Sequence, residues 1–245
     1  MHEDRIEGRN SVLEALRSDR TINKLLIAKG SREGSINKII ALAKEKRIII
    51  TEVMKQKLDS ISDTEAHQGV IAFVAPIKYV DVLDILDEAK RKGEAPFILI
   101  LDEIEDPHNF GAILRTANAV GVHGVIIPKR RSVGVTSVVA KASAGAVEYV
   151  KIARVANISN AIDLLKENGV WIYGIEANGS SKFYKENLRG AIAIVIGSEG
   201  KGIGKLVTHK CDFLLNIPMK GEITSLNASV AGAVVMYEVL KQREV

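Results

Sequence analysis

The stretch FILILDEIEDPHNFGAILRTANA, residues 97–119, joins an apolar run of strand length to a helix. Phe97–Leu101 is apolar at every position, as expected of a strand that is covered on both faces. After a polar loop, Gly111–Ala119 has apolar residues at helical spacing. Asn109 is a residue type that favours the N-cap of such a helix. The stretch therefore predicts one strand–helix unit.

The same alternation continues to the end of the chain. The further strands that we predict are rich in Ile, Val and Leu: Gly124–Ile127, Val147–Ile152, Val170–Ile175, Ala191–Ile196 and Phe213–Ile217. The further helices that we predict are Ser137–Ala144, Ile158–Glu167, Ile203–Thr208 and Leu226–Gln242. Alternation of this kind predicts an α/β domain with a mostly parallel sheet flanked by helices. Such sheets bind ligands at the carboxyl ends of their strands.

A smaller α/β pattern precedes this domain. Its predicted strands are Lys24–Lys29, Arg47–Val53 and Gly69–Ala75, and its predicted helices are Ser11–Arg17, Glu33–Lys46 and Gln56–Ile61. Asn10 or Ser11 can cap the first of these helices. A charged helix at Asp81–Lys92 and the polar KRKGEAP run lie between the two patterns. We therefore expect a front domain at 1–76, a linker at 77–95 and a main domain at 96–245.

Composition excludes several classes of protein. The chain has 245 residues, 47% hydrophobic and 26% charged, which is ordinary for a globular protein. It begins with a polar stretch, and Ala228–Tyr237 is shorter than the roughly 20 residues that span a bilayer, so we expect a cytoplasmic protein without membrane segments. Its one cysteine, Cys211, cannot form an internal disulfide, and no Cys/His spacing predicts a metal site. The net charge of +4 permits an anionic partner.

Arg115 is the first candidate functional residue. It lies on the predicted helix beside the apolar Leu114 and Ala117. Burying an unpaired guanidinium would be costly. Arg115 is therefore either a surface residue with a buried stem or a ligand for a phosphate or carboxylate.

The stretch IVIGSEGKGIG, residues 194–204, leads a strand directly into four glycines. Glycines permit tight turns and leave backbone donors facing a ligand. A P-loop requires lysine where Ile203 stands, and a dinucleotide fingerprint starting at Gly200 fails at Lys205. Glu199 would repel phosphates, which favours a ligand with cationic or hydroxyl groups. An ordinary glycine-rich turn remains the alternative.

Two further segments contain candidate residues. In IPMKGEITSLNASVA, residues 217–231, Ser225 stands at a predicted helix start and Asn227 is a polar residue that needs a partner in an apolar context. The alternative is that Ser225 only caps the helix and Asn227 is solvated. The adjacent cations Lys129, Arg130 and Arg131 suit contacts to phosphates, or are simply solvated.

Together these segments resemble the three signature motifs of the SpoU/TrmH family of RNA 2′-O-ribose methyltransferases. The first motif, N-x-G-x-x-x-R-T-A, is matched by Asn109, Gly111, Arg115, Thr116 and Ala117. The second, I-G-x-E-x-x-G, and the third, I-P-M…S-L-N-x-S, are matched by Ile196, Gly197, Glu199, Gly202, Ile217, Pro218, Met219, Ser225, Leu226, Asn227 and Ser229. The front stretches IEGRNSVLEAL and HQGVIA resemble the RNA-binding domain of RlmB-type members.

The resemblance implies an S-adenosylmethionine-dependent enzyme with a trefoil-knotted C-terminal domain, acting as a homodimer with composite active sites. RlmB-type members methylate a guanosine ribose in 23S rRNA, so we expect large-subunit rRNA as the RNA partner. A tRNA guanosine methyltransferase, or an antibiotic-resistance rRNA methyltransferase, is the alternative. A non-catalytic RNA-binding protein with the same fold is a second hypothesis, and a nucleotide-dependent dehydrogenase or NTPase is a third.

The family motifs also imply roles for individual residues. Arg115 would activate the ribose 2′-hydroxyl, either by losing its own proton or by holding a substrate phosphate that takes the proton. The second version suits the high pKa of arginine better. Four more residues would orient the reacting groups: Asn109, Glu199, Ser225 and Asn227. The cofactor would contact Gly197, Ile217, Leu226, Met219 and Ala177. RNA phosphates would contact the front domain and Lys129, Arg130 and Arg131, and no metal is expected.

Overall fold

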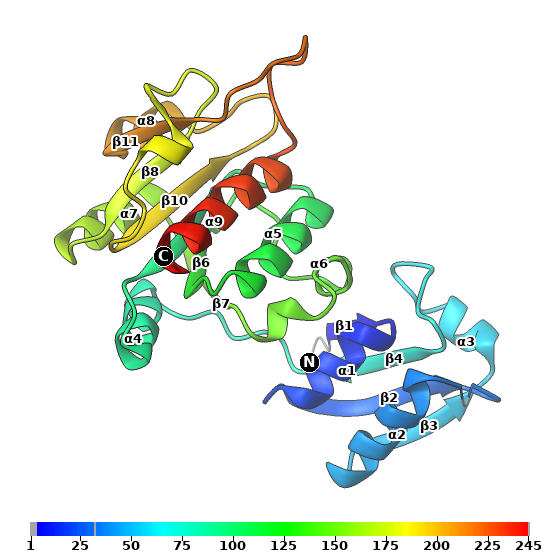
Figure 1. Cartoon of the computed structure of the whole chain (residues 1–245). Helices are drawn as coiled ribbons and strands as arrows, with labels where there is room; N and C mark the ends of the chain where they lie inside the picture. The colour runs from blue at the N-terminus through cyan, green and yellow to red at the C-terminus, as the bar shows by residue number, and fades with distance from the viewer. Residues whose placement is uncertain (1–3, 32, 245) are drawn as a thin grey trace. The chain divides into compact units, whose positions relative to one another are not determined.

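The computed structural model describes residues 4–31 and 33–244, which form two compact units. The smaller unit contains the described residues up to Lys78 together with Gly134–Tyr149. The larger unit contains Tyr79–Val133 and the described residues from Val150 onward. Figure 1 shows the sheet of each unit with the helices that cover it. Within the described ranges, no helix is both long and apolar enough to cross a membrane.

The smaller unit is built on a four-stranded sheet in the order β1-β4-β2-β3. Its strands are β1 (Asp4–Glu7), β2 (Ile22–Ala28), β3 (Ile49–Val53) and β4 (Val70–Val74). β4 pairs antiparallel with β1 and β2, whereas β3 pairs parallel with β2. The helical elements are α1 (Arg9–Arg17), α2 (Ser35–Glu45), α3 (Lys55–Asp59), α6 (Ser137–Ala142) and the 3₁₀ helix η1 (Ala146–Glu148).

The sequence did not predict β1, whose DRIE composition is charged. Its Glu7 is nevertheless fully buried. The Glu7 carboxylate accepts hydrogen bonds from the Ser62 hydroxyl (2.7 Å) and from the backbone N–H groups of Asp63 (2.6 Å) and Thr64 (3.2 Å). Burial alone raises the pKa of Glu7, but the hydrogen bonds from Thr64, Ser62 and the backbone outweigh it, so the pKa lies below its ordinary value of 4.5. Long-range hydrogen bonds therefore hold this strand in place.

The larger unit contains a seven-stranded sheet in the order β7-β6-β5-β10-β8-β11-β9. Its strands are β5 (Phe97–Asp102), β6 (Gly124–Pro128), β7 (Lys151–Val155), β8 (Trp171–Ile175), β9 (Ser181–Lys182), β10 (Ile192–Gly197) and β11 (Phe213–Asn216). All neighbouring strands pair in parallel. The predicted α/β class with a mostly parallel sheet is therefore confirmed.

Helices cover both faces of this sheet. They are α4 (Val82–Lys92), α5 (Pro107–Ala119), α7 (Ile158–Glu167), α8 (Lys205–Lys210) and α9 (Ala228–Glu244), and a 3₁₀ helix η2 (Phe183–Lys185) follows β9. α4, α7 and α8 share one hydrophobic core with the sheet. α5 and α9 pack against each other on the opposite face (Figure 1). There α9 approaches β10 so closely that a Cβ on Gly232 would lie 2.6 Å from Ile196 Cδ1.

Several boundaries differ from the sequence-based prediction, and three of the differences have a clear physical reason. The strand predicted at Val147–Ile152 begins only at Lys151, because Ala146 and Val147 are buried in a 3₁₀ turn of the smaller unit. Asp106, and not Asn109, caps α5. Its side chain accepts hydrogen bonds from the backbone N–H groups of His108 and Asn109, and Pro107 occupies the first helical position. The predicted capping of the first helix by Asn10 or Ser11 is also wrong, because α1 starts after Gly8.

Candidate active site

The main cavity of the larger unit lies beyond the carboxyl ends of β8, β10 and β11 and has a volume of about 550 Å³. All five residues that the sequence predicted for cofactor binding line it: Ala177, Gly197, Ile217, Met219 and Leu226. Glu199 and Ser225 line it as well. This is the position where a parallel α/β sheet binds a ligand, because the strand ends leave backbone groups and loops facing outward.

The glycine-rich loop after β10 folds back on itself. Ser198 and Gly202 pair as a short antiparallel bridge, with N–H···O distances of 3.1 and 2.9 Å. A Cβ on Gly197 would lie 2.1 Å from the carbonyl carbon of Gly202, so only glycine fits where the two strands of the loop meet. Gly202 itself has a φ of 66°, a conformation that other residues rarely adopt.

Two carboxylates outside the loop hold its far end. Glu176, after β8, accepts from the Ile203 N–H at 2.9 Å, and Asp102, at the end of β5, accepts from the Gly204 N–H at 2.8 Å. Burial raises the pKa of Asp102, with the nearby Glu103 acting in the same direction. These backbone donors are thus already used by carboxylates. These two donors are therefore not free to bind a phosphate.

Inside the loop, Glu199 joins Asn109 and Asn227 in one hydrogen-bonded cluster. The Asn109 Nδ2 donates to Glu199 Oε1 at 3.0 Å, and the Asn227 Nδ2 donates to Asn109 Oδ1 at 2.8 Å. Asn227 also donates to Glu199, and the Ala228 N–H approaches the same carboxylate oxygen at 3.4 Å. The loop, α5 and the start of α9 therefore meet at these three side chains.

Asn227 also starts α9. Its Oδ1 accepts from the backbone N–H groups of Ser229 (3.0 Å) and Val230 (3.2 Å), which is the geometry of an N-cap. The helix consequently begins at Ala228, two residues later than predicted, and Ser225 lies before it in the cavity wall. One asparagine thus fixes both the helix start and the Glu199 cluster.

A second cavity of about 270 Å³ lies on the other side of this cluster. Asn109, Ser198, Glu199 and Lys201 line it together with residues 103–106. Since Ser198, Glu199 and Lys201 belong to both cavities, the tip of the glycine-rich loop separates two spaces that two different molecules could occupy.

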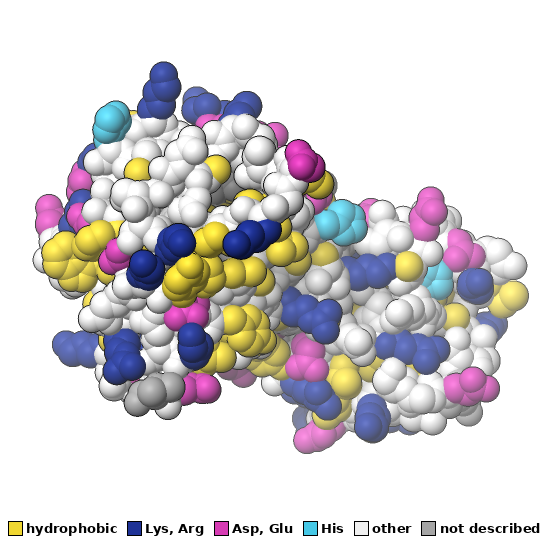
Figure 2. Space-filling model, turned by 45° about the horizontal axis from the view of Figure 1, so that its top comes forward, with side chains coloured by type: hydrophobic (Ala, Val, Ile, Leu, Met, Phe, Trp, Pro, Cys, Tyr) yellow, Lys and Arg dark blue, Asp and Glu magenta, His cyan; other side chains and the backbone are white. Residues whose placement is uncertain are grey.

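Arg115 does not join the cluster within this chain. At about 3.6 residues per turn, positions 109 and 115 lie roughly 120° apart around the axis of α5. Arg115 is exposed and has no hydrogen bond or ion pair with any residue that the structure describes. Near it, α9 leaves Val230 and Tyr237 about half exposed although its opposite side is buried. Figure 2 shows hydrophobic side chains on one face of the larger unit, with Lys and Arg side chains beside them.

The basic run after β6 stands apart from the main cavity. Lys129, Arg130 and Arg131 are all exposed. Arg131 pairs with Glu103 at 2.7 Å, and Glu103 lines the second cavity. Of the three, only Arg131 is thus tied to a cavity-lining residue by an ion pair in the described structure.

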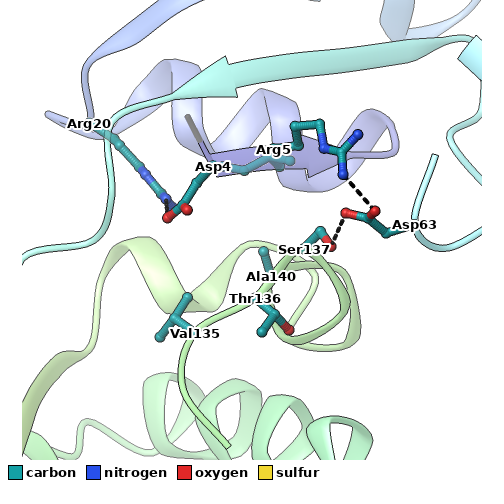
Figure 3. A pocket seen from close by; sticks show the side chains of 9 residues that line it. Asp4, Arg5, Arg20, Asp63, Val135, Thr136, Ser137 and Ala140 are labelled. Atoms are coloured by element: carbon teal, nitrogen blue, oxygen red, sulfur yellow. Dashed lines mark hydrogen bonds and ion pairs between the residues drawn. The ribbon is translucent and has the colours of Figure 1, made fainter. Parts of the chain in front are cut away.

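The smaller unit has a cavity of its own, of about 220 Å³ (Figure 3). Two arginines line it, but both are compensated. Arg5 pairs with Asp63 at 2.7 Å, and the almost fully buried Arg20 pairs with Glu148 at 2.7 Å and Asp4 at 3.6 Å. The cavity therefore offers no free positive charge to an anion.

Sequence reasoning missed Glu176, Asp102 and Lys201 as members of the site. The available signal was weak: Asp102 and Glu176 are each the first acidic residue after an apolar strand, which is where a parallel sheet places ligand contacts. Lys201 stood in the quoted loop without an assigned role.

Family comparisons agree with this arrangement. A family model described as the SpoU rRNA methylase family matches residues 96–237, and one described as RNA 2′-O ribose methyltransferase substrate binding matches residues 5–80. A Bacillus subtilis protein named as a TrmH family tRNA/rRNA methyltransferase is 49% identical over 98% of this chain and 96% of its own length. A Staphylococcus saprophyticus protein of the same description is 50% identical over 99% and 97%.

Solved structures show the same fold. The SpoU methyltransferase AviRb of Streptomyces viridochromogenes, in complex with S-adenosylmethionine, superposes with a TM-score of 0.84 at 21% identity and covers 99% of this chain and 91% of that one. An S-adenosylmethionine-bound rRNA methyltransferase of Sinorhizobium meliloti has a TM-score of 0.80 at 23% identity and covers 98% and 87%.

Proposed function

The chain belongs to the SpoU family of RNA methyltransferases, and on that premise we propose that it methylates a ribose 2′-hydroxyl in RNA with S-adenosylmethionine as the methyl donor. We propose a guanosine of 23S rRNA as the target, and a homodimer as the active assembly. The observation that carries the proposal is the Glu199–Asn109–Asn227 cluster between two adjoining cavities.

The main cavity fits the cofactor by size and chemistry. Its volume of about 550 Å³ lies in the range of small-molecule sites, roughly 300–1,000 Å³. Ile196, Ile217 and Leu226 supply apolar walls, while Glu176 and Ser225 supply polar groups. When bound, S-adenosylmethionine supplies an electrophilic methyl group on a sulfonium.

In the proposed mechanism the acceptor ribose enters the second cavity. Asn109 and Glu199 line this cavity and also belong to the hydrogen-bonded cluster. They are therefore placed to orient the acceptor toward the cofactor cavity. Because Asn227 and the start of α9 hold Glu199, the cluster fixes the angle at which the two reactants meet. Alignment of this kind supplies a large part of the rate of a bimolecular transfer.

We assign Arg115 to the ribose hydroxyl and its neighbouring phosphate. A guanidinium with a pKa above about 12 is a poor base. It can instead hold a substrate phosphate that takes the proton, while its charge stabilises the developing alkoxide.

Arg115 reaches this position from the partner subunit. Within one chain it lies on the exposed side of α5, without a partner among the described residues. The adjoining α9 is apolar on both sides and exposes Val230 and Tyr237, which suits a helix that packs against another protein surface. A two-fold dimer through α5 and α9 would cover this face and bring each Arg115 to the other subunit's cavity.

Mixed dimers test this arrangement. Arg115→Ala and Glu199→Ala should each abolish methyl transfer. Combined and refolded together, the two inactive variants should regain up to about a quarter of wild-type activity, since half of the dimers are then mixed and each mixed dimer holds one intact composite site. No recovery, with mixed dimers demonstrated by differently tagged subunits, would contradict the composite site.

For the RNA substrate, we propose that the smaller unit and Lys129–Arg131 bind RNA phosphates. The substrate-binding family model over residues 5–80 supports this role for the smaller unit. Ribose methylation should be mapped in rRNA and tRNA from cells with and without the gene. Loss of one guanosine 2′-O-methyl mark in 23S rRNA is expected, whereas loss of a tRNA mark alone would favour the tRNA alternative.

A further inference from the structure

Glu176 is the acidic residue of the cofactor cavity that takes no part in the proposed transfer step. It directly follows β8, and its backbone N–H donates to the Leu215 carbonyl at 2.9 Å, which continues the pairing of β8 with β11. Its own carbonyl accepts from the Gly179 N–H at 3.0 Å and closes a turn. The backbone of Glu176 is therefore fixed from both sides.

The side chain of Glu176 is fixed as well. Its Oε1 accepts from the Ile203 N–H, and a Cβ on Gly202 would lie 3.1 Å from Oε1 and 3.3 Å from Oε2. The carboxylate thus lies flat against the base of the glycine-rich loop. No described residue forms an ion pair with it, and its second oxygen accepts no hydrogen bond from the described chain. It is a positioned acceptor with unused capacity.

Its place within the cavity limits what it can bind. Glu199, the other carboxylate of this cavity, already accepts from Asn109, Asn227 and the Ala228 backbone. Glu199 also lines the second cavity, where the acceptor ribose enters, whereas Glu176 does not. Glu176 therefore lies away from the acceptor ribose, on a side of the main cavity where a part of the cofactor other than the methyl group would lie.

We infer that Glu176 is a cofactor-binding residue whose carboxylate accepts hydrogen bonds from the ribose hydroxyls of S-adenosylmethionine. The two hydroxyls stand on adjacent carbons, so both can donate toward one carboxylate. The same pairing of an acidic side chain with ribose hydroxyls recurs in α/β nucleotide sites. Ile203 and Gly202 hold the carboxylate in place, and the apolar walls can then cover the adenine. This inference rests on the proposed function and adds a determinant of cofactor selectivity to it.

The test is a binding cycle between one side chain and the two hydroxyls. Calorimetry should compare the wild-type protein, Glu176→Gln and the exposed control Glu167→Gln. Each protein is titrated with S-adenosylmethionine, with S-adenosylhomocysteine and with the 2′,3′-dideoxy analogue of S-adenosylhomocysteine. Glutamine retains an oxygen for the Ile203 N–H but replaces the charged acceptor. We expect Glu176→Gln to weaken S-adenosylhomocysteine binding by about ten- to a hundredfold, the range for a charged hydrogen bond, and the control to leave it unchanged. All three proteins should bind the dideoxy analogue equally.

Four outcomes would overturn the inference. An equal loss for S-adenosylhomocysteine and its dideoxy analogue would mean that Glu176 does not act through the ribose hydroxyls, and no loss would mean that it does not touch the cofactor. A loss several times larger for S-adenosylmethionine than for S-adenosylhomocysteine would assign the carboxylate to the sulfonium. If the wild-type protein bound neither S-adenosylmethionine nor S-adenosylhomocysteine, the proposed function itself would fail, and the inference with it.

Discussion

Replacing Glu199 with alanine should damage the active site and the stability of the larger unit together. The carboxylate accepts from Asn109, Asn227 and the Ala228 N–H. Asn227 is exposed and can turn to water, but Asn109 is 9% exposed, so its Nδ2 would lose its acceptor in a buried place. A buried polar group left without a partner costs about 1–3 kcal/mol.

The expected loss of stability can be measured as a shift of Tm in thermal unfolding. For a domain of roughly 150–250 residues, each kcal/mol lowers Tm by about 2–4 °C, so Glu199→Ala should lower it by about 2–12 °C. Glu199→Gln keeps an oxygen acceptor for Asn109, and its neutral hydrogen bonds contribute about 0.5–1.5 kcal/mol each. The Tm of Glu199→Gln should therefore lie between those of the wild type and Glu199→Ala. The exposed Glu167→Ala on α7 serves as the control and should melt with the wild type.

Methyl transfer should fall more steeply than stability. Because the cluster aligns two reactants, a displacement of about 1 Å costs on the order of a hundredfold in rate, and we expect at least that loss for Glu199→Ala below its melting temperature. The assay is transfer of a labelled methyl group to total rRNA at saturating cofactor. If Glu199→Ala melted with the wild type and transferred at the wild-type rate, the cluster would have neither of the roles argued here.

Two further changes test separate parts of the site, and a third tests the smaller unit. Arg115→Ala should abolish transfer while leaving Tm and S-adenosylhomocysteine binding unchanged, because the side chain has no partner in the described chain; weakened binding of that ligand would contradict its placement. Gly197→Ala should lose cofactor binding, since its Cβ would lie 2.1 Å from the Gly202 backbone, and calorimetry with wild-type affinity would refute this. Glu7 has a folded pKa below 4.5, so its ionised form stabilises the smaller unit above the unfolded pKa, and this stability is lost as pH falls through the folded value. Glu7→Gln should therefore reduce the fall of the free energy of unfolding with decreasing pH. An unchanged pH dependence would exclude Glu7 as the cause of that fall.

The larger sheet was predictable because its strands carry their own signal. β5 and β10 are apolar at nearly every position, which is typical of strands covered on both faces. β1 lacked this signal. Its Glu7 can be buried because residues 62–64, far along the chain, donate hydrogen bonds to the carboxylate. The cap of α5 was predictable in principle: Asp106 before Pro107 is a stronger start signal than Asn109.

The site was predictable as a set of residues but not as an arrangement. The spacing of motifs named Asn109, Glu199 and Asn227, and the structure adds that they touch. The motif spacing named Arg115 as well, but the groups that it faces in the proposed dimer belong to a second subunit, which no spacing within one sequence specifies. Glu176 had no motif around it, and only its position against the Ile203 N–H distinguishes it from the other glutamates.

The distribution of charge around the glycine-rich loop fits the proposal that one site uses both an adenosine cofactor and an RNA phosphate. Glu176 and Asp102 occupy the backbone donors at the end of the loop, and Glu199 occupies its interior. Three carboxylates around one loop repel phosphates, so nucleoside triphosphates and dinucleotides are poor ligands, whereas a cofactor with hydroxyls and a sulfonium is a good one. The RNA phosphate must then be held from outside this shell of negative charge. In the proposed dimer, the guanidinium of Arg115 on the exposed side of α5 of a second subunit meets that requirement. An arginine placed beside Glu199 in the same chain would instead be neutralised by it.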